Sequence, residues 1–406
     1  MIGRRTFFMG AGSAALATSA AGANDRVRFA VIGAGVRGGH MAGVFAGFED
    51  AQCAAVCDVF KPTRDAIAAK LPGSPDPVVD YRRVLDRKDV DAVLIATPDH
   101  WHGPIMMEAC QAGKDCYVEK PITNSIEVGL KMIEAARRNK RVVQVGLQQR
   151  SWQHFQENAK RVQDGMFGTV YQAQCVYRGN YLRPYEKPVD PPAGLDWDLF
   201  QGPAERRPYT PSRQRTWRSF YDYSGGTLLD WGVHLTHIAY WYMNAKAPLI
   251  ATGSGQYVRT PCPERDQLPD SVAFTWVYDK FTMTYSNAPM YFPQFDGQGN
   301  YFIGTLGALH VNRTGYRFWP NPPFRLRPGE TPPPPPFEAV DKSFPYVGQP
   351  ADAAHIRNFI DCIKSRARPL VDIEDGFYAT LPCLMGVLAI RYGKTYQWTG
   401  QEAKAV

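Results

Sequence analysis

The chain has 406 residues, which is long enough for two domains of ordinary size. Its hydrophobic content of 44% and charged content of 21% are typical of a globular protein and exclude an intrinsically disordered one. The net charge of +7 comes from basic residues that are scattered along the chain, which argues against a nucleic-acid-binding surface.

The N-terminal segment, residues 1–23, has the layout of a cleavable export signal of the twin-arginine type. Arg4 and Arg5 precede an apolar stretch of small residues that ends in Ala-Gly-Ala. That stretch is too short and too rich in Ala and Gly to span a bilayer stably. An ordinary secretory signal or a buried helix is the alternative. We therefore predict export by the twin-arginine machinery, for example to the periplasm, with no stable membrane insertion of the mature chain.

Residues 26–150 alternate short apolar strands with amphipathic helices, which predicts a parallel sheet covered on both faces. The expected strands are 27–32, 52–57, 92–96, 116–118 and 142–145. The expected helices are 62–71, 104–112 and 126–139. This order is typical of a Rossmann dinucleotide-binding domain.

Residues 151–398 have a different pattern, in which apolar and polar residues alternate with period two. We expect strands at 170–177, 272–278, 281–285 and 301–311, with a hairpin turn at Asp279 and Lys280. The Pro-rich run 319–337 predicts an irregular loop, and 351–396 predicts closing helices. The fold class is therefore α/β, with a Rossmann domain followed by an α+β domain whose large sheet is mostly antiparallel.

The eight cysteines include several within apparent core strands. Cys53 and Cys57 lie four residues apart on one strand, about 13 Å from each other, which is too far for a disulfide. Their spacing is not that of a metal site. We expect buried free thiols.

A glycine-rich turn, Gly33-Ala34-Gly35-Val36-Arg37-Gly38, follows the first strand and opens a helix. The G-x-G-x-x-G spacing brings backbone N–H groups to a pyrophosphate. Asp58 stands at the end of the second strand, where a carboxylate can hold both ribose hydroxyls and repel a 2′-phosphate. The sequence therefore predicts NAD as the cofactor.

Three further segments carry polar residues of the kinds that enzymes use in catalysis. The first is 97–102, which ends in His100-Trp101-His102, and the second is Glu119-Lys120-Pro121. The third is 225–234, where Asp230 and His234 are four residues apart. Residues four apart share one face of a helix. Oxidation of a carbinol needs a base for the O–H proton and a cation for the developing oxyanion, which His234 and Lys120 can supply.

Together with the glycine turn, these segments resemble the glucose-fructose oxidoreductase / inositol dehydrogenase / rhizopine catabolism (Gfo/Idh/MocA) family over nearly the whole chain from residue 26. The Gly304–Gly307 turn and the closing helices agree with it. The resemblance implies a Rossmann domain, an open sheet that often forms the oligomer interface, and activity on sugars, cyclitols and their derivatives. A homodimer or homotetramer is expected.

The resemblance also implies roles for individual residues. Lys120 would touch the reacting hydroxyl and the nicotinamide ribose, His234 would move the hydroxyl proton, and Asp230 would hold substrate. The expected cofactor contacts are Gly33, Gly35, Val36, Arg37, Gly38, Asp58, Thr97, Pro98, His100, His102, Glu119, Lys120 and Gln148. Further substrate contacts are expected from Arg150, Tyr181, Arg218 and His237. No metal is expected, because two histidines without a third ligand are a weak metal signal.

Three functions remain open at this stage. One is an NAD-dependent carbohydrate oxidoreductase that keeps and recycles its own NAD, which suits an exported enzyme. The second is a redox-neutral NAD-dependent glycosidase that oxidises C3 transiently. The NAD-dependent α-N-acetylgalactosaminidases of this kind differ from this chain, because they replace the Glu-Lys-Pro segment and use a Tyr/His motif. The third is a non-catalytic protein that binds NAD and sugar.

Overall fold

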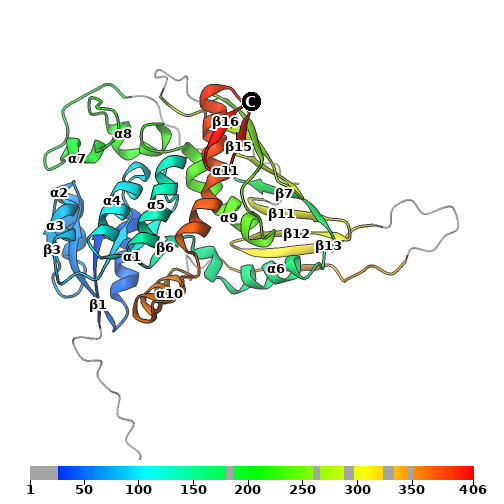
Figure 1. Cartoon of the computed structure of the whole chain (residues 1–406), viewed down its shortest axis with the longest axis horizontal. Coiled ribbons are helices and arrows are strands. Elements are labelled where there is room, and N and C mark those ends of the chain that lie inside the picture. Colours follow the sequence, from blue (N-terminus) through cyan, green and yellow to red (C-terminus); the bar gives the residue numbers. More distant parts are fainter. Residues whose placement is uncertain (1–25, 180–185, 259–265, 288–296, 323–332, 346–350) are drawn as a thin grey trace, which may run out of the picture.

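The computed structural model describes residues 26–179, 186–258, 266–287, 297–322, 333–345 and 351–406. Two sheets organise these residues, and helices lie between and around them (Figure 1). The predicted export signal at 1–23 lies outside the described residues, as does Tyr181.

The first sheet is parallel, with the strand order β3-β2-β1-β4-β5-β6. Its strands are β1 (Val27–Ile32), β2 (Ala51–Cys57), β3 (Asp76–Val78), β4 (Ala92–Ile95), β5 (Asp115–Glu119) and β6 (Val143–Gly146). Its helices are α1 (Val36–Ala46), α2 (Lys61–Ala68), α3 (Tyr81–Leu85), α4 (Asp99–Gln111) and α5 (Ile126–Arg138). The chain reverses its winding between β1 and β4, and ligands of such sheets bind at that switch point. The predicted Rossmann domain is confirmed.

Two details of this domain differ from the prediction. Strand β3 has only three residues and offers no buried apolar run, so periodicity gave no signal for it. Helix α4 begins at Asp99 instead of at 104, and Pro104 lies inside it. Prolines are common in the first helical turn, which made Pro104 a reasonable but incorrect start.

The second sheet has ten strands in the order β14-β13-β12-β11-β7-β10-β9-β8-β15-β16. The strands are β7 (Val170–Val176), β8 (Ile250–Gln256), β9 (Ser271–Val277), β10 (Thr282–Ser286), β11 (Gly299–Gly304), β12 (Gly307–Asn312), β13 (Gly315–Pro320), β14 (Val340–Ser343), β15 (Tyr396–Trp398) and β16 (Ala403–Ala405). Among the pairings with a recorded register, only β7 with β10 is parallel. This confirms the large, mostly antiparallel sheet.

The hairpin predicted at Asp279 and Lys280 joins β9 to β10. The single strand predicted at 301–311 is two strands, β11 and β12, joined at the Gly304–Gly307 turn. The irregular run predicted at 319–337 begins inside β13, because Trp319 pairs with Ala308 across the hairpin. Residues 333–337 lie in neither helix nor strand, and 323–332 lie outside the described residues.

Helices of the second half cover one face of this sheet and fill the space between the two domains (Figure 1). They are α6 (Gln153–Gln163), α9 (Val233–Tyr242) and α11 (Ile373–Tyr392), whereas α10 (Ala351–Ser365) lies against the Rossmann domain. Helix α11 is long and apolar enough to cross a membrane, but most of it is buried against α9 and β8, as expected of a core helix. Helix α10 packs against α1, with Phe359 beside Phe45.

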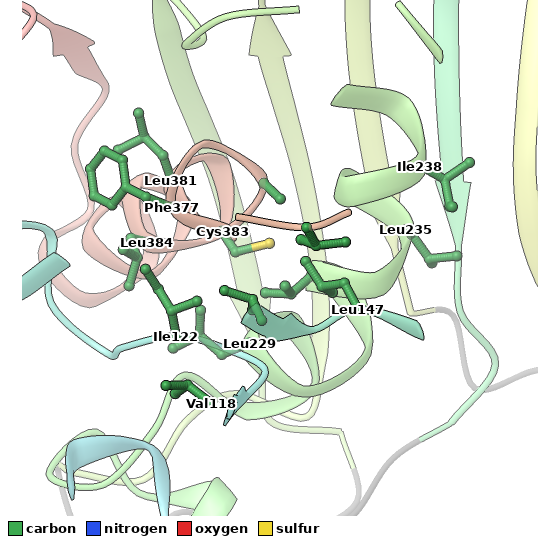
Figure 2. Packing of buried hydrophobic residues seen from close by; sticks show 14 of the residues in the cluster. Val118, Ile122, Leu147, Leu229, Leu235, Ile238, Phe377, Leu381, Cys383 and Leu384 are labelled. Atoms are coloured by element: carbon green, nitrogen blue, oxygen red, sulfur yellow. The ribbon is translucent and has the colours of Figure 1, made fainter. Parts of the chain in front are cut away.

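The interface between the domains is part of the main hydrophobic core. Figure 2 shows Val118 and Ile122, from β5 and the segment after it, near Leu229 and the α11 residues Phe377 and Leu384. All of these side chains are buried. This packing holds the end of β5, where Lys120 stands, next to the start of α9.

Candidate active site

The glycine-rich turn between β1 and α1 has the shape of a dinucleotide cradle. Gly33 has φ +87°, and a Cβ there would lie 2.6 Å from the backbone nitrogen of Thr97. A Cβ on Gly35, in contrast, would meet nothing within 4 Å, so this position leaves open space above the helix N-terminus. Val36 follows it and is 98% exposed. An open backbone approach to the first turn of a helix is what a pyrophosphate needs.

Asp58 is tied to this turn. One of its carboxylate oxygens accepts a hydrogen bond from the backbone N–H of Ala34, and the other accepts one from Phe60, both at 2.8 Å. Burial raises the pKa of Asp58, and the two backbone hydrogen bonds oppose that rise. Both oxygens keep acceptor capacity for ribose hydroxyls. The residues at this end of the cavity therefore fit the adenosine half of NAD.

Arg37 was predicted to contact the cofactor, but its main contacts in the structure are with other side chains of the protein. Its Nε donates to Glu119 at 2.7 Å, and two further nitrogens donate to the carboxylate of Asp352 at 2.8 and 3.2 Å. Arg37 thus connects α1 to β5 and α10, although its side chain also lines the cavity. Glu119 in turn accepts from the backbone N–H of Lys120 at 3.3 Å.

A segment that we call the cover segment, residues 186–224, lies over the Rossmann domain and includes α7 (Trp197–Gln201) and α8 (Pro211–Arg215) (Figure 1). Its backbone is bonded to the loop after β2, through Lys61 N–H to Gly194 and Asp196 N–H to Val59. The indole N–H of Trp101 on α4 donates to Leu199 at 3.0 Å. The cover segment has its own apolar cluster: Trp197, Phe200, Tyr209, Phe220 and Tyr223.

A cavity of about 590 Å³ runs from the glycine turn, beneath the cover segment, to the start of α9. Its lining includes almost all of the cofactor contacts predicted from the sequence, together with Lys120, Arg218, Asp230 and His234. We call the end lined by Asp99, Lys120, Arg218, Asp230, Trp231, His234 and Arg313 the carbinol end. The predicted catalytic residues are thus in one place, at the far end of the predicted dinucleotide site.

Lys120 and Asp230 form the centre of the carbinol end. The Lys120 ammonium donates to Asp230 Oδ1 at 2.5 Å and to the Asp230 backbone carbonyl at 2.8 Å. Arg218 Nε lies 3.2 Å from the same carboxylate oxygen. Burial raises the pKa of Asp230, but the charges of Lys120 and Arg218 outweigh it and hold the pKa below its usual value. Asp230 is therefore ionised at neutral pH.

His234 lies one turn beyond Asp230. The turn that carries Asp230, Leu228–Gly232, is π-helical and runs directly into α9. Burial, with the positive charges of Arg313 and Lys120, lowers the pKa of His234 well below its usual value. The imidazole is therefore neutral, which is the form that accepts a proton. Its Nδ1 is buried and has no hydrogen-bond partner in the described part of the chain.

His102 contacts the backbone next to Lys120. One ring nitrogen lies 2.7 Å from the carbonyl oxygen of Pro121, and the other lies 2.9 Å from that of Thr97. The side chain therefore joins the ends of β4 and β5. His102, Thr97, Pro98 and Gln148 all line the cavity, as predicted. Across the described residues, no group of three His, Cys, Asp or Glu side chains is placed to hold a metal ion.

Four predicted contacts in the described part of the chain are not in the lining of the cavity: Gly38, His100, Arg150 and His237. Gly38 instead packs against the turn itself, since a Cβ there would lie 1.8 Å from the backbone oxygen of Gly33. His100 points into the apolar cluster of the cover segment, where a ring nitrogen lies 3.0 Å from the Phe200 carbonyl oxygen. Arg150 packs over the Trp241 ring, with its guanidinium carbon 4.8 Å from the ring centroid. His237, one turn beyond His234, is completely buried beside the same Trp241. The structure therefore does not bring His100, Arg150 and His237 together with the other predicted site residues.

Several residues that line the cavity were not predicted from the sequence. Asp99 lies in the segment 97–102 that was predicted to contribute to the site, but the sequence does not show that Asp99 itself is buried. Arg313 comes from the turn between β12 and β13, far along the chain, and no motif surrounds it. Trp217 and Trp231 are large aromatic residues, which occur in a hydrophobic core as well as in a binding site, so their type alone did not mark them. Leu195, Leu199 and Phe200 come from the cover segment.

Comparison with known proteins identifies the two domains. Residues 27–147 match the model of the oxidoreductase family's NAD-binding Rossmann fold, and residues 169–290 match the model of its C-terminal alpha/beta domain. A scyllo-inositol 2-dehydrogenase (NAD(+)) of Bacillus subtilis is 25% identical over 377 residues, which cover 90% of this chain and 93% of that protein.

Other relatives match over a shorter length. An inositol 2-dehydrogenase of Rhodococcus jostii is 33% identical over 165 residues, which cover 40% of this chain and 44% of that protein. A glycosyl hydrolase family 109 protein of Shewanella sp. is 28% identical over 178 residues, 42% of this chain and 39% of that protein. These two matches therefore span less than half of each relative.

Solved structures share the fold at low identity. The scyllo-inositol dehydrogenase of Lactobacillus casei, solved with NAD(H) and scyllo-inositol, superposes with a TM-score of 0.65 at 18% identity, over 92% of this chain and 99% of that one. The aldose-aldose oxidoreductase of Caulobacter crescentus superposes with a TM-score of 0.63 at 20% identity, over 92% and 100%. With both domain models matched in order over more than half of its length, the chain belongs to the Gfo/Idh/MocA oxidoreductase family.

Proposed function

We propose that the chain is an NAD-dependent oxidoreductase that acts on a CH–OH group of a carbohydrate. The observation that carries this proposal is the grouping of Lys120, Asp230 and His234 at one end of a cavity whose other end is the dinucleotide turn. The inositol dehydrogenases among the relatives support a polyhydroxylated substrate. An intact set of catalytic groups argues against a purely nucleotide-binding role.

The chain's own residues supply the acid–base part of the reaction, and bound NAD would supply the hydride acceptor. The neutral His234 imidazole accepts the proton of the substrate hydroxyl. The Lys120 ammonium stabilises the oxyanion that develops as this proton leaves. Asp230 accepts two hydrogen bonds from Lys120, through its carboxylate and its backbone carbonyl, and so fixes the position of the ammonium.

The cover segment supports a cofactor that stays bound between turnovers. It contributes Leu195, Leu199 and Phe200 to the lining of the cavity that Asp58 and the glycine turn also line, and it is hydrogen-bonded to the Rossmann domain. We therefore propose that NAD is held tightly and recycled in place, by oxidising one carbohydrate and reducing another.

The alternative is a redox-neutral glycosidase, which the match to the family 109 glycosyl hydrolases favours. In that reaction C3 of the sugar is oxidised, the acidified C2 proton is removed, the aglycone leaves, water adds, and C3 is reduced again. Asp99 could protonate the leaving group, because burial raises its pKa to about 7. We prefer net oxidation, because this chain keeps Lys120 and the Asp230/His234 pair.

Product analysis distinguishes the two functions. The purified chain is incubated with aldoses, cyclitols and aryl glycosides without added nucleotide, and its bound NAD and the products are measured. Sugar-dependent reduction of the bound NAD, reversed by a second sugar, supports the oxidoreductase. Release of the aryl alcohol without net reduction supports the glycosidase. Failure of every substrate to do either would contradict both.

We further propose that residues 1–23 direct twin-arginine export. An enzyme that recycles its own cofactor needs no nicotinamide pool, which suits a compartment outside the cytoplasm. Replacement of Arg4 and Arg5 by Lys should leave the full-length precursor inside the cell, as measured by fractionation. Unchanged export of this variant would contradict a twin-arginine signal.

We also propose a homodimer or homotetramer formed through the uncovered face of the ten-stranded sheet. Val277 and Trp319 are 38% and 40% exposed on that sheet. A contact through this face predicts that Val277→Lys lowers the molar mass measured by light scattering. A monomeric wild type would overturn the proposal.

A further inference from the structure

His237 on α9 is a buried imidazole, and both of its ring nitrogens lack a hydrogen-bond partner among the described residues. Burial lowers the pKa of His237 well below its usual value, so the ring is neutral, with one N–H donor and one acceptor nitrogen. His355 is equally buried, but its Nδ1 lies 2.8 Å from Ser151 Oγ and its Nε2 lies 2.9 Å from the Val145 carbonyl oxygen. A buried polar group without a partner is rare and points to a bound group such as an ordered water.

The segment that packs beside His237 carries polar atoms of the same kind. This segment is the short helical turn η2 (Gln148–Ser151), which contacts α9. In the part of the chain that the structure describes, Arg150 Nη1 and Gln149 Oε1 are also buried without a partner. Arg150 packs over the Trp241 ring, and His237 stacks beside the same ring at 6.2 Å between centroids. Arg150 and His237 therefore lie together, and a water could join them because it donates and accepts hydrogen bonds at once.

The base His234 has a similar feature on its inner side. Its Nδ1 is buried, so Nε2 is the nitrogen left to meet a substrate in the cavity. To accept the hydroxyl proton, Nε2 must carry no hydrogen, and Nδ1 must then carry it. The hydrogen bond that Nδ1 makes decides which tautomer is present. No described residue accepts that hydrogen bond directly.

His237 is placed to supply the missing acceptor through a water. It lies three residues beyond His234, and residues three apart are neighbours on one face of a helix. Side chains of a helix lean towards its N-terminus, so the His237 ring leans towards the turn that carries His234. The two imidazoles influence each other electrostatically. A bridging water has polar partners available at His234, His237 and Arg150, and buried waters typically make about three hydrogen bonds.

We infer that an ordered water between His234 Nδ1 and His237 holds His234 in the tautomer that accepts the substrate proton at Nε2. His237 is then a positioning residue that acts through His234. This inference rests on the proposed oxidoreductase, in which His234 is the base, and it adds the group that orients that base.

The first test measures which nitrogen of His234 carries the hydrogen. Long-range nitrogen–proton NMR correlations of the chain labelled with nitrogen-15 histidine distinguish the two tautomers. The chain has eight histidines, so the His234 signals are assigned by their loss in His234→Gln. We expect the hydrogen on Nδ1 in the wild type and in His237→Asn, whose amide can hold the same water. A wild type with the hydrogen on Nε2 would overturn the inference without any variant.

The variant His237→Phe removes both ring nitrogens but keeps a flat ring, and we expect it to move the His234 hydrogen to Nε2. The matched control is Tyr242→Phe, which removes another buried polar group of α9, the hydroxyl that donates to the Phe155 carbonyl at 2.7 Å. This control should keep the wild-type tautomer. A His237→Phe chain that keeps the hydrogen on Nδ1 would overturn the inference and leave the oxidoreductase standing.

Kinetics provide a second readout. In His237→Phe, kcat for reduction of bound NAD should fall by about 10- to 100-fold, with KM within about twofold of the wild type. NAD content should be unchanged, because the cofactor contacts remain. His237→Asn should recover most of the rate, and Tyr242→Phe should keep it. A wild type with the hydrogen on Nδ1 that no sugar reduces would support the water bridge and contradict the proposed function.

Discussion

The ammonium of Lys120 lies 2.5 Å from the carboxylate of Asp230, although the two residues are 110 positions apart and belong to different domains. Lys120 follows β5 of the Rossmann sheet, and Asp230 lies in the π-helical turn before α9. The hydrophobic interface of Figure 2 brings these two elements together. The contact between Lys120 and Asp230 therefore forms only when both domains are packed against each other.

Replacement of Lys120 by Ala should lower kcat about 100- to 1,000-fold, because the developing oxyanion loses its cation. Lys120→Arg should not restore the rate, because a planar guanidinium cannot reproduce the geometry of the ammonium. Bound NAD should remain in both variants, as measured after denaturation. The control is Lys131→Ala on the surface of α5, which should keep full activity. An active Lys120→Ala variant would show that the assigned site is wrong.

Asp99 should make the free energy of unfolding fall as the pH rises. Burial raises its pKa from 3.8 to about 7, so between these values the unfolded chain loses a proton that the folded chain keeps. The free energy of unfolding of the wild type, relative to Asp99→Asn, should therefore be highest below pH 4 and fall by about 4 kcal/mol as the pH rises to 7. Thermal unfolding of both proteins across this range measures the difference. If the difference in the free energy of unfolding between the two proteins does not change with pH, the raised pKa of the buried Asp99 carboxyl is contradicted.

The cover segment should control how fast NAD leaves. Trp101→Phe removes the indole N–H that holds Leu199, at a cost of about 1 kcal/mol, so the dissociation rate should rise roughly fivefold. The NAD content after prolonged dialysis reports this change, and added NAD should restore activity. Trp319→Phe on the sheet should lose NAD at the wild-type rate. If Trp101→Phe retains NAD as well as the wild type does, the cover segment does not hold the cofactor.

The seven described cysteines are buried and free: Cys53, Cys57, Cys110, Cys116, Cys175, Cys362 and Cys383. Burial raises the pKa of Cys53 and of Cys383 to about 12, so little thiolate is present at neutral pH. We expect these seven thiols to react with an alkylating reagent only after unfolding. Mass spectrometry of the native, labelled protein checks this, and rapid labelling of any of the seven would contradict their burial.

The sequence predicted the parts of the site that depend on local geometry. The glycine turn and Asp58 follow from one strand-turn-helix-strand unit, and Lys120 was predicted from its place at the end of a parallel strand. The structure does not bring His100, Arg150 and His237 to the cavity, because the direction of a side chain depends on how its segment packs in three dimensions. Arg313 was missed for a related reason: a hairpin turn brings it to the cavity, and nothing local marks it. The cover segment has no periodic pattern that would have placed it over the nucleotide site.

The most direct test of a carbohydrate oxidoreductase with a captive cofactor is to add sugars to the purified chain, with no added nucleotide, and follow the near-ultraviolet absorbance of reduced nicotinamide. We predict a single burst that approaches one reduced NAD per chain, absent in Lys120→Ala and reversed by a second sugar. A chain that contains no nucleotide, and that turns over only when NAD is added in excess, would contradict the captive cofactor.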